Sequence, residues 1–172
     1  MEKIRKPVSA SLAIKSEILL PNDTNTIDNL MGGRLMHWMD VVGGICAQRH
    51  SQCLVVTASV DNISFTRSIP LGNVVTMEAK VTRAFNTSME VHIVVWSEDL
   101  PNGHKVKSNT AFLTYVAVDK NGQPLIVPEA IPETEEEQTL YEGALQRRQL
   151  RLLLAGRIKP EEAPELRTIF YP

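Results

Sequence analysis

The sequence predicts an α+β fold in which an antiparallel sheet wraps around a central helix, with a further helix at the C-terminus. Three observations indicate this fold. An almost entirely apolar helical segment lies at about residues 33–49. The segments around it alternate between apolar and polar residues with period two, and turn residues separate them. A segment with helix start and stop signals closes the chain.

The central helix is predicted from Gly33 to about Arg49. Its apolar residues lie on nearly every side and are Leu35, Met36, Trp38, Met39, Val41, Val42, Ile45 and Cys46. Because a helix that is hydrophobic all round belongs in the interior, Asp40 in its middle is expected to be buried. A buried carboxylate is costly unless it is hydrogen-bonded or paired, and such costs tend to persist where they serve chemistry. Asp40 is therefore a candidate catalytic residue.

A polar, turn-rich loop at residues 21–31 leads into this helix. The loop contains Asn25, and the helix begins at the pair Gly32-Gly33. The first backbone N–H groups of a helix have no partner within it and can face an oxyanion. Glycine at this place lets a ligand approach the backbone closely. The loop and the helix start therefore offer donors for developing negative charge.

Alternation predicts one strand before the helix and four after it. The predicted strands cover residues 8–20, 54–65, 74–85, 89–97 and 106–119. A sheet can cover only part of the circumference of the helix, so a single subunit would expose apolar surface on it. This exposure predicts a partner subunit.

Composition is that of an ordinary soluble protein. The chain has 172 residues, which suggests one core, and 43% of them are apolar and 22% charged. The net charge of −2 gives no reason to expect nucleic-acid or membrane binding. We expect neither a signal peptide nor a transmembrane segment, since no apolar run is long enough. The two cysteines, Cys46 and Cys53, suit a reduced compartment and are expected to be small apolar core residues, which favours the cytoplasm.

The order and spacing of these motifs resemble the hotdog-fold acyl-CoA thioesterases of the cytosolic acyl-CoA hydrolase family. That family has an Asn in the loop and an Asp fifteen residues later in the helix, as Asn25 and Asp40 are here. The resemblance continues through residues 55–65, 70–75 and 112–119, and it spans about residues 8–130. It implies a hotdog thioesterase domain at residues 1–132, followed by a helical extension at residues 133–172.

The resemblance implies hydrolysis of acyl-CoA to a free carboxylic acid and CoA. No cofactor is implied, because CoA is part of the substrate. Asp40 would act as general base on water or as nucleophile, and Asn25 of the opposite subunit would orient the water or the thioester. Gly33 would donate to the oxyanion, and Thr57 matches a strand threonine that supplies a supporting hydroxyl. The family also implies a dimer that assembles further into a hexamer, a trimer of dimers.

The same residues have plainer interpretations. Asn25 lies in a stretch with good turn chemistry, and the glycine pair could serve only as a tight start of the helix. His37 lies three residues before Asp40 on the same helix face, which would suit an acid–base pair or a metal site. The other histidines form no ligand spacing, and no HExxH, CxxC or P-loop pattern occurs, so we expect no metal. We favour a packed interface histidine for His37.

Binding of CoA is expected at Gly32, through its backbone, and at Arg67, Lys105 and Lys107. In the plainer interpretation these three cations are solvated surface charges. The resembled family has Arg-Pro soon after the Phe of its strand. Here residues 65–70 keep the Phe and Arg67 but place the proline three residues after the arginine.

The C-terminal segment begins with a proline-rich stretch at residues 124–132, which is predicted to be a linker. Thr134 and Glu137 form a capping-box signature for a helix that runs to about Ala155, where Gly156 can end it. The start of this helix is acidic and its end is basic, which complements its macrodipole. The alternative is that the basic end meets CoA phosphates or another subunit.

Two other functions are compatible with the sequence. A dehydratase or hydratase of acyl thioesters on the same fold would need His37 as an essential residue. A non-catalytic module would bind acyl-CoA and release no thiol.

Overall fold

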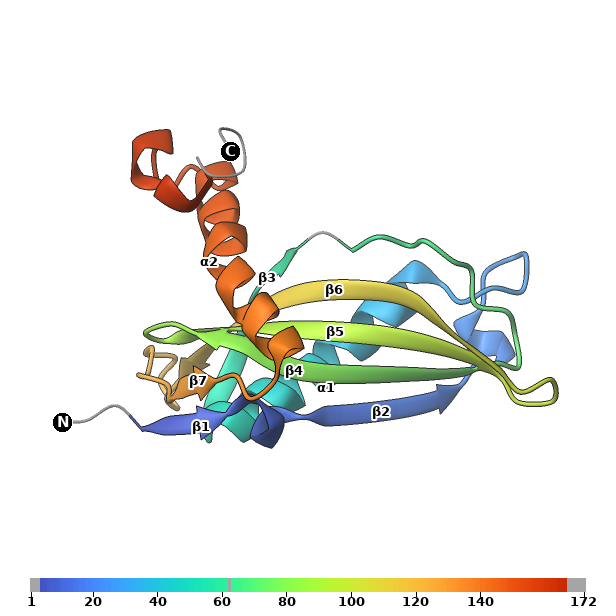
Figure 1. The fold of residues 1–172 in the computed structure, drawn as a ribbon. Helices are drawn as coiled ribbons and strands as arrows, with labels where there is room; N and C mark the ends of the chain where they lie inside the picture. The colour runs from blue at the N-terminus through green and yellow to red at the C-terminus, as the bar shows by residue number, and fades with distance from the viewer. Residues whose placement is uncertain (1–3, 62, 167–172) are drawn as a thin grey trace.

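A five-stranded antiparallel sheet wraps around helix α1 (Gly32–Ser51) in the computed structural model, which describes residues 4–61 and 63–166 (Figure 1). In order across the sheet, its strands are β2 (Ala13–Ile18), β4 (Val74–Ala84), β5 (Ser88–Asp99), β6 (His104–Val118) and β3 (Leu54–Asp61). All four neighbouring pairs are antiparallel. The predicted α+β fold with a sheet around a central helix is confirmed.

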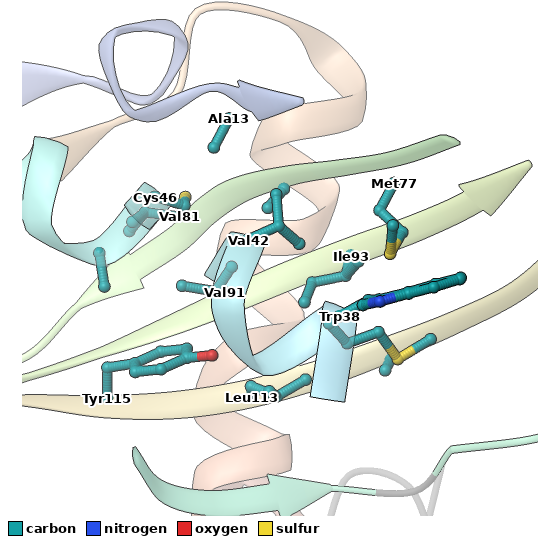
Figure 2. Close-up of a cluster of buried hydrophobic side chains, with 14 of the residues drawn as sticks. Ala13, Trp38, Val42, Cys46, Met77, Val81, Val91, Ile93, Leu113 and Tyr115 are labelled. Atoms are coloured by element: carbon teal, nitrogen blue, oxygen red, sulfur yellow. The ribbon is translucent and has the colours of Figure 1, made fainter. Parts of the chain in front are cut away.

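The core fills the space between the inner face of the sheet and one side of α1. The alternation along β4 places Val75, Met77, Ala79 and Val81 in this layer, each fully buried. The helix contributes buried residues at spacings of three and four, the period of one helix face, and they include Leu35, Trp38, Met39, Val42 and Cys46. Figure 2 shows the helix residues Trp38, Val42 and Cys46 facing the strands that carry Met77 and Val81.

The first predicted strand, residues 8–20, is wrong in its first part. Val8–Ser11 form the 3-10 turn η1, and only Ala13–Ile18 form a strand. The buried Ser11 hydroxyl explains the break, because it donates to the Val8 carbonyl and accepts from the Val81 amide. Such a side chain offers the backbone an alternative to the ladder of a sheet.

The stretch at residues 124–132 is more than a linker. Its residues Glu129–Ile131 form β7, which pairs in parallel with β1 (Arg5–Pro7) in a separate two-stranded sheet. The predicted strand at residues 54–65 is shorter in the structure, since β3 ends at Asp61. Two further 3-10 turns occur in the described residues, η2 (Pro21–Asp23) and η3 (Pro160–Glu162).

Helix α2 (Glu135–Leu154) crosses the outer face of the sheet, opposite α1 (Figure 1). The predicted helix and its cap are confirmed: the Thr134 side chain accepts from the Glu137 amide, and Gly156 follows the helix with φ +65°. The predicted reciprocal contact of Glu137 reaches the amide of Glu133, one residue earlier than in a standard capping box. Residues 167–172 of the predicted extension lie outside the described residues.

The basic end of α2 is held by the chain's own sheet. Arg147 forms a forked ion pair with Glu90, whose side chain is fully buried, at distances of 2.8 to 3.1 Å. Arg151 pairs with Asp61 at 2.7 Å. A carboxylate as deeply buried as that of Glu90 requires a charged partner. The Arg147–Glu90 pair therefore fixes the position of α2 on the sheet.

His92 lies under α2, stacked on the Phe112 ring with 4.7 Å between ring centroids. Burial, and then the positive charges of Lys107 and Arg147, lower the pKa of His92 to about 4. An unfolded chain binds a proton at this residue below about pH 6.5, whereas the folded chain does so only near pH 4. The stability that depends on neutral His92 is therefore present above pH 6.5 and is lost as the pH falls toward 4.

We expect a His92→Asn variant to lose less stability than the wild type when the pH is lowered from 7 to 4.5. The measurement is the denaturant midpoint of unfolding across this range, with a variant of the exposed His104, His104→Asn, as the control. Carboxylates also titrate in this range and change the midpoint of every variant. The quantity to compare is therefore the slope of the midpoint against pH in the wild type and in His92→Asn. Equal slopes for His92→Asn and the wild type would contradict the expected result.

No helix in the described part of the chain combines the length and the hydrophobicity needed to cross a membrane.

Candidate active site

Asp40 is exposed in the single chain, which corrects the expectation that it is buried. The sheet leaves part of α1 uncovered, and Asp40 lies at the margin of this part, exposed but within reach of β3. Three apolar side chains share the exposed part of the helix, and they are Met36, Val41 and Ile45. The predicted exposure of apolar helix surface in a single subunit is thus confirmed, and the carboxylate lies among these residues.

The carboxylate of Asp40 is held from the sheet. The Thr57 hydroxyl on β3 donates to Oδ1 of Asp40 at 2.6 Å. Thr57 lies at a β-bulge, where the register with β6 shifts between Thr57 and Ser59. Bulges of this kind re-aim side chains and are frequent beside active sites. The structure thus brings together the two predicted residues Asp40 and Thr57.

Tyr115 on β6 is a third member of this group that the sequence analysis missed. Its hydroxyl lies 2.9 Å from the backbone carbonyl oxygen of Asp40 and 3.3 Å from Oδ1. Burial, and then the charge of Asp40, raise the pKa of Tyr115. The phenol therefore stays protonated and remains a donor at neutral pH. The glycine pair Gly43-Gly44 in the middle of α1 was the available sequence signal, because glycine is a poor helix former.

The side-chain oxygen of Asn25 stabilises the loop, and its side-chain NH₂ group is available to a ligand. Its side-chain oxygen accepts from the amides of Ile27 and Asn29, each at 3.1 Å, in the manner of an Asx turn. Its Nδ2 takes part in none of the hydrogen bonds among the described residues. The loop therefore fixes the side chain through its oxygen and leaves the NH₂ group to donate to a ligand.

The start of α1 lies beside this loop. Arg34 pairs with Asp23 at 2.8 Å, and the Met31 amide donates to the Asp23 carbonyl. A Cβ on Gly32 would lie 3.2 Å from the Phe65 ring, whereas a Cβ on Gly33 would meet nothing within 4 Å. Gly32 therefore makes room for an aromatic ring, and Gly33 faces open space with no side-chain cap over the helix start.

Asn25, Gly32 and Arg67 line one cavity of about 360 Å³, together with Phe65 and Asn109. Asp40 and Thr57 are not among its lining residues. Asp40 is seven residues along the helix from Gly33, an axial distance of about 10 Å. Within one chain the predicted site residues thus form two groups: a loop group around Asn25 and a helix group around Asp40.

The other predicted residues lie outside both groups. Lys105 and Lys107 are exposed on β6, near the hairpin that connects it to β5, and Lys105 lies over the Trp96 ring at 5.5 Å. His37 is exposed on α1. Among the described residues, no three His, Cys, Asp or Glu side chains gather as they would around a metal ion.

The chain is similar to known thioester hydrolases along most of its length. Residues 28–103 match the family described as the thioesterase superfamily. An uncharacterized acyl-CoA thioester hydrolase of Bacillus subtilis is 42% identical over 137 residues, which cover 80% of each chain.

Two solved structures are similar in fold and in sequence. A hexameric acyl-CoA thioesterase has a TM-score of 0.86 and 38% identity, covering 88% of this chain and 97% of its own. An acyl-CoA hydrolase of Staphylococcus aureus, solved with butyryl coenzyme A, coenzyme A and coenzyme A disulfide, has a TM-score of 0.82 and 33% identity. The match covers 89% of this chain and 95% of that one.

The Staphylococcus aureus hydrolase was also solved as three alanine variants. The replaced residues are an asparagine, an aspartate fifteen positions later and a threonine seventeen positions after that. Asn25, Asp40 and Thr57 have the same spacing.

Proposed function

The chain belongs to the acyl-CoA thioester hydrolases of the thioesterase superfamily and hydrolyses acyl-CoA thioesters, and we propose that it does so at a site built from two subunits. The helix group, Asp40 with Thr57, comes from one subunit. The loop group, Asn25 with Gly33, comes from its partner. Each group is incomplete alone, since one holds the carboxylate and the other the donors for a carbonyl oxygen.

The observation that carries this proposal is the apolar surface around the helix group. Met36 and Ile45 are 44% and 42% exposed on α1, and Val56 on the neighbouring strand β3 is 50% exposed. β3 is also an edge strand of the sheet, so one row of its backbone groups is free to pair. A second copy related by a two-fold axis would cover this surface and pair the two β3 edges. It would also bring a loop group toward each helix group.

The relatives support the choice of residues and of assembly. The matched spacing of an asparagine, an aspartate and a threonine in the Staphylococcus aureus hydrolase supports the roles of Asn25, Asp40 and Thr57. The hexameric thioesterase supports a trimer of such dimers. Both cysteines are free thiols, which supports a cytoplasmic enzyme.

The mechanism follows from the two groups. The thioester carbonyl oxygen accepts from Nδ2 of Asn25 and from the backbone N–H of Gly33. Oδ2 of Asp40 takes a proton from a water molecule as its oxygen bonds to the carbonyl carbon. The tetrahedral intermediate then collapses, the C–S bond breaks, and the proton on Asp40 passes to the departing CoA sulfur. Direct attack by Oδ2 would instead form an anhydride that water cleaves, and it uses the same geometry.

Binding of the CoA part is assigned to the cations near the loop group. Arg67 lines the cavity that contains Asn25 and can pair with a phosphate. Lys105 and Lys107 lie further along β6 and supply positive charge toward the same end of the sheet. Gly32 contributes backbone to this cavity.

A thiol-release assay over acyl-CoA substrates of short to long chain tests the proposed function. We expect many equivalents of free CoA and of carboxylic acid per subunit for at least one chain length. Stoichiometric binding without thiol release would indicate a binding module. A change in the acyl double bond without thiol release would indicate a hydratase or dehydratase, and either result would overturn the proposal.

A further inference from the structure

The hydroxyl of Tyr115 reaches out of the core to the helix group. Tyr115 lies on β6 with its ring buried between the sheet and α1, and its oxygen points at the helix (Figure 2). The hydroxyl lies 2.9 Å from the carbonyl oxygen of Asp40 and 3.3 Å from Oδ1 of the same residue.

The helix is shaped to admit this hydroxyl. A Cβ on Gly43 would lie 2.4 Å from the Tyr115 oxygen and 3.0 Å from two ring carbons, so no other residue fits without displacing the phenol. A Cβ on the adjacent Gly44 would approach the ring only to 3.9 Å, an ordinary contact. Glycine weakens a helix interior. Gly43 is thus matched to the phenol of Tyr115, and Gly44 provides a natural control.

We propose that Tyr115 is a positioning residue for the hydrolysis. Thr57 holds the Asp40 carboxylate through Oδ1, Tyr115 holds the Asp40 backbone carbonyl and makes a longer contact to Oδ1, and Oδ2 is left to act on water. This inference rests on the proposed role of Asp40. Thr57 and Tyr115 come from the neighbouring strands β3 and β6 and are direct partners in their register. The hydroxyls of Thr57 and Tyr115 are thus both fixed to the sheet, and both contact the Asp40 side chain on the helix.

The hydrogen bonds from Thr57 and Tyr115 restrict the rotation of the Asp40 carboxylate. In the hydrogen bonds among the described residues, Asp40 accepts through Oδ1 and through its carbonyl oxygen, and Oδ2 does not take part. Hydrogen bonds donated to a carboxylate stabilise the charged form that a general base requires. Other titratable groups on α1 include His37, one helical turn before Asp40, and Cys46, whose pKa burial raises to about 12.

The test is the kinetics of a Tyr115→Phe variant, which keeps the ring and removes the hydroxyl. We expect kcat to fall about tenfold and KM to change by less than about twofold, because the hydroxyl acts on the base and not on the substrate. The acidic limb of the pH profile should move to higher pH, since the base loses a hydrogen-bond donor that stabilises its charged form. The same shift in a His37→Gln background would exclude His37 as its source.

Matched variants separate positioning from general damage to the fold. Tyr141→Phe removes a phenol hydroxyl on α2, outside the helix group, and should leave kcat and the pH profile unchanged. Gly43→Ala should reproduce the loss of kcat seen for Tyr115→Phe, whereas Gly44→Ala should not. Circular dichroism and gel filtration check that each variant keeps its fold and assembly.

Two outcomes would overturn the inference and differ from failure of the proposed function. If Asp40→Asn is inactive while Tyr115→Phe keeps wild-type kcat and pH profile, Tyr115 has no positioning role and the proposed site stands. A lower kcat with an unchanged pH profile in Tyr115→Phe would indicate that Tyr115 has only a structural role. If Asp40→Asn itself turns over normally, the proposed function fails first.

Discussion

Replacing Asp40 by asparagine is expected to lower kcat by about 10²- to 10⁴-fold, the range lost when a general acid or base is removed. Asparagine has nearly the same shape, and its side-chain oxygen can still accept from Thr57. It cannot take a proton from water or form an anhydride. KM should change little, because the CoA part is bound elsewhere. The loss should therefore appear in kcat and in kcat/KM alike.

A carboxylate at the opposite edge of the sheet provides the control for this variant. Glu17 lies on β2, where it pairs with Lys15. A Glu17→Gln variant should keep turnover within about twofold of the wild type, because an exposed pair contributes little. Gel filtration should show the same assembly for both variants. Turnover by Asp40→Asn above about a tenth of the wild-type rate would contradict the role of this residue.

The long strands could be predicted because each has one buried face. β4 and β5 alternate between residues that are buried against α1 and residues that face outward, so their period of two is clear in the sequence. Their predicted bounds differ from the observed ones by one or two residues. α1 could be predicted from its nearly continuous apolar content, and α2 from the cap at Thr134 and the stop signal at Gly156.

The two-stranded sheet of β1 and β7 could not be predicted in the same way. Each strand has three residues and therefore no measurable period, and Pro7 argues against a strand. The break before β2 depends on the Ser11 hydroxyl, whose partner Val81 lies 70 residues away in the sequence. Local patterns hold no information on such contacts.

The site could be predicted only in part, because some of its contacts also join residues that are distant in the sequence. Asn25, Asp40 and Thr57 were found because their spacing resembles that of a known family. The burial of Asp40 was mispredicted, because an apolar pattern does not distinguish a helix face covered by its own sheet from one that awaits another subunit. Tyr115 was missed because alternation places it in the core, and its partner Asp40 lies 75 residues away.

A mixture of two inactive proteins is expected to regain activity. Asn25→Ala lacks the loop-group donor, and Asp40→Ala lacks the helix-group carboxylate. In a mixed dimer, a site shared between subunits receives both wild-type groups at one position and neither at the other. If half of the dimers are mixed after random exchange, and if the sites are independent, the activity should reach about a quarter of the wild-type value.

A second mixture distinguishes a shared site from one within a single chain. Wild-type protein is exchanged with an equal amount of a double variant that carries both Asn25→Ala and Asp40→Ala. A shared site leaves activity only in wild-type dimers, about a quarter of the value for an all-wild-type sample. A site within one chain would keep about half.

The most direct measurement is thiol release by the mixture of the two single variants after native mass spectrometry has demonstrated subunit exchange. A site composed of Asn25 from one subunit and Asp40 from the other predicts recovery to about a quarter of wild-type activity. A mixture that stays at the level of its inactive parents, with mixed dimers present, would contradict the shared site.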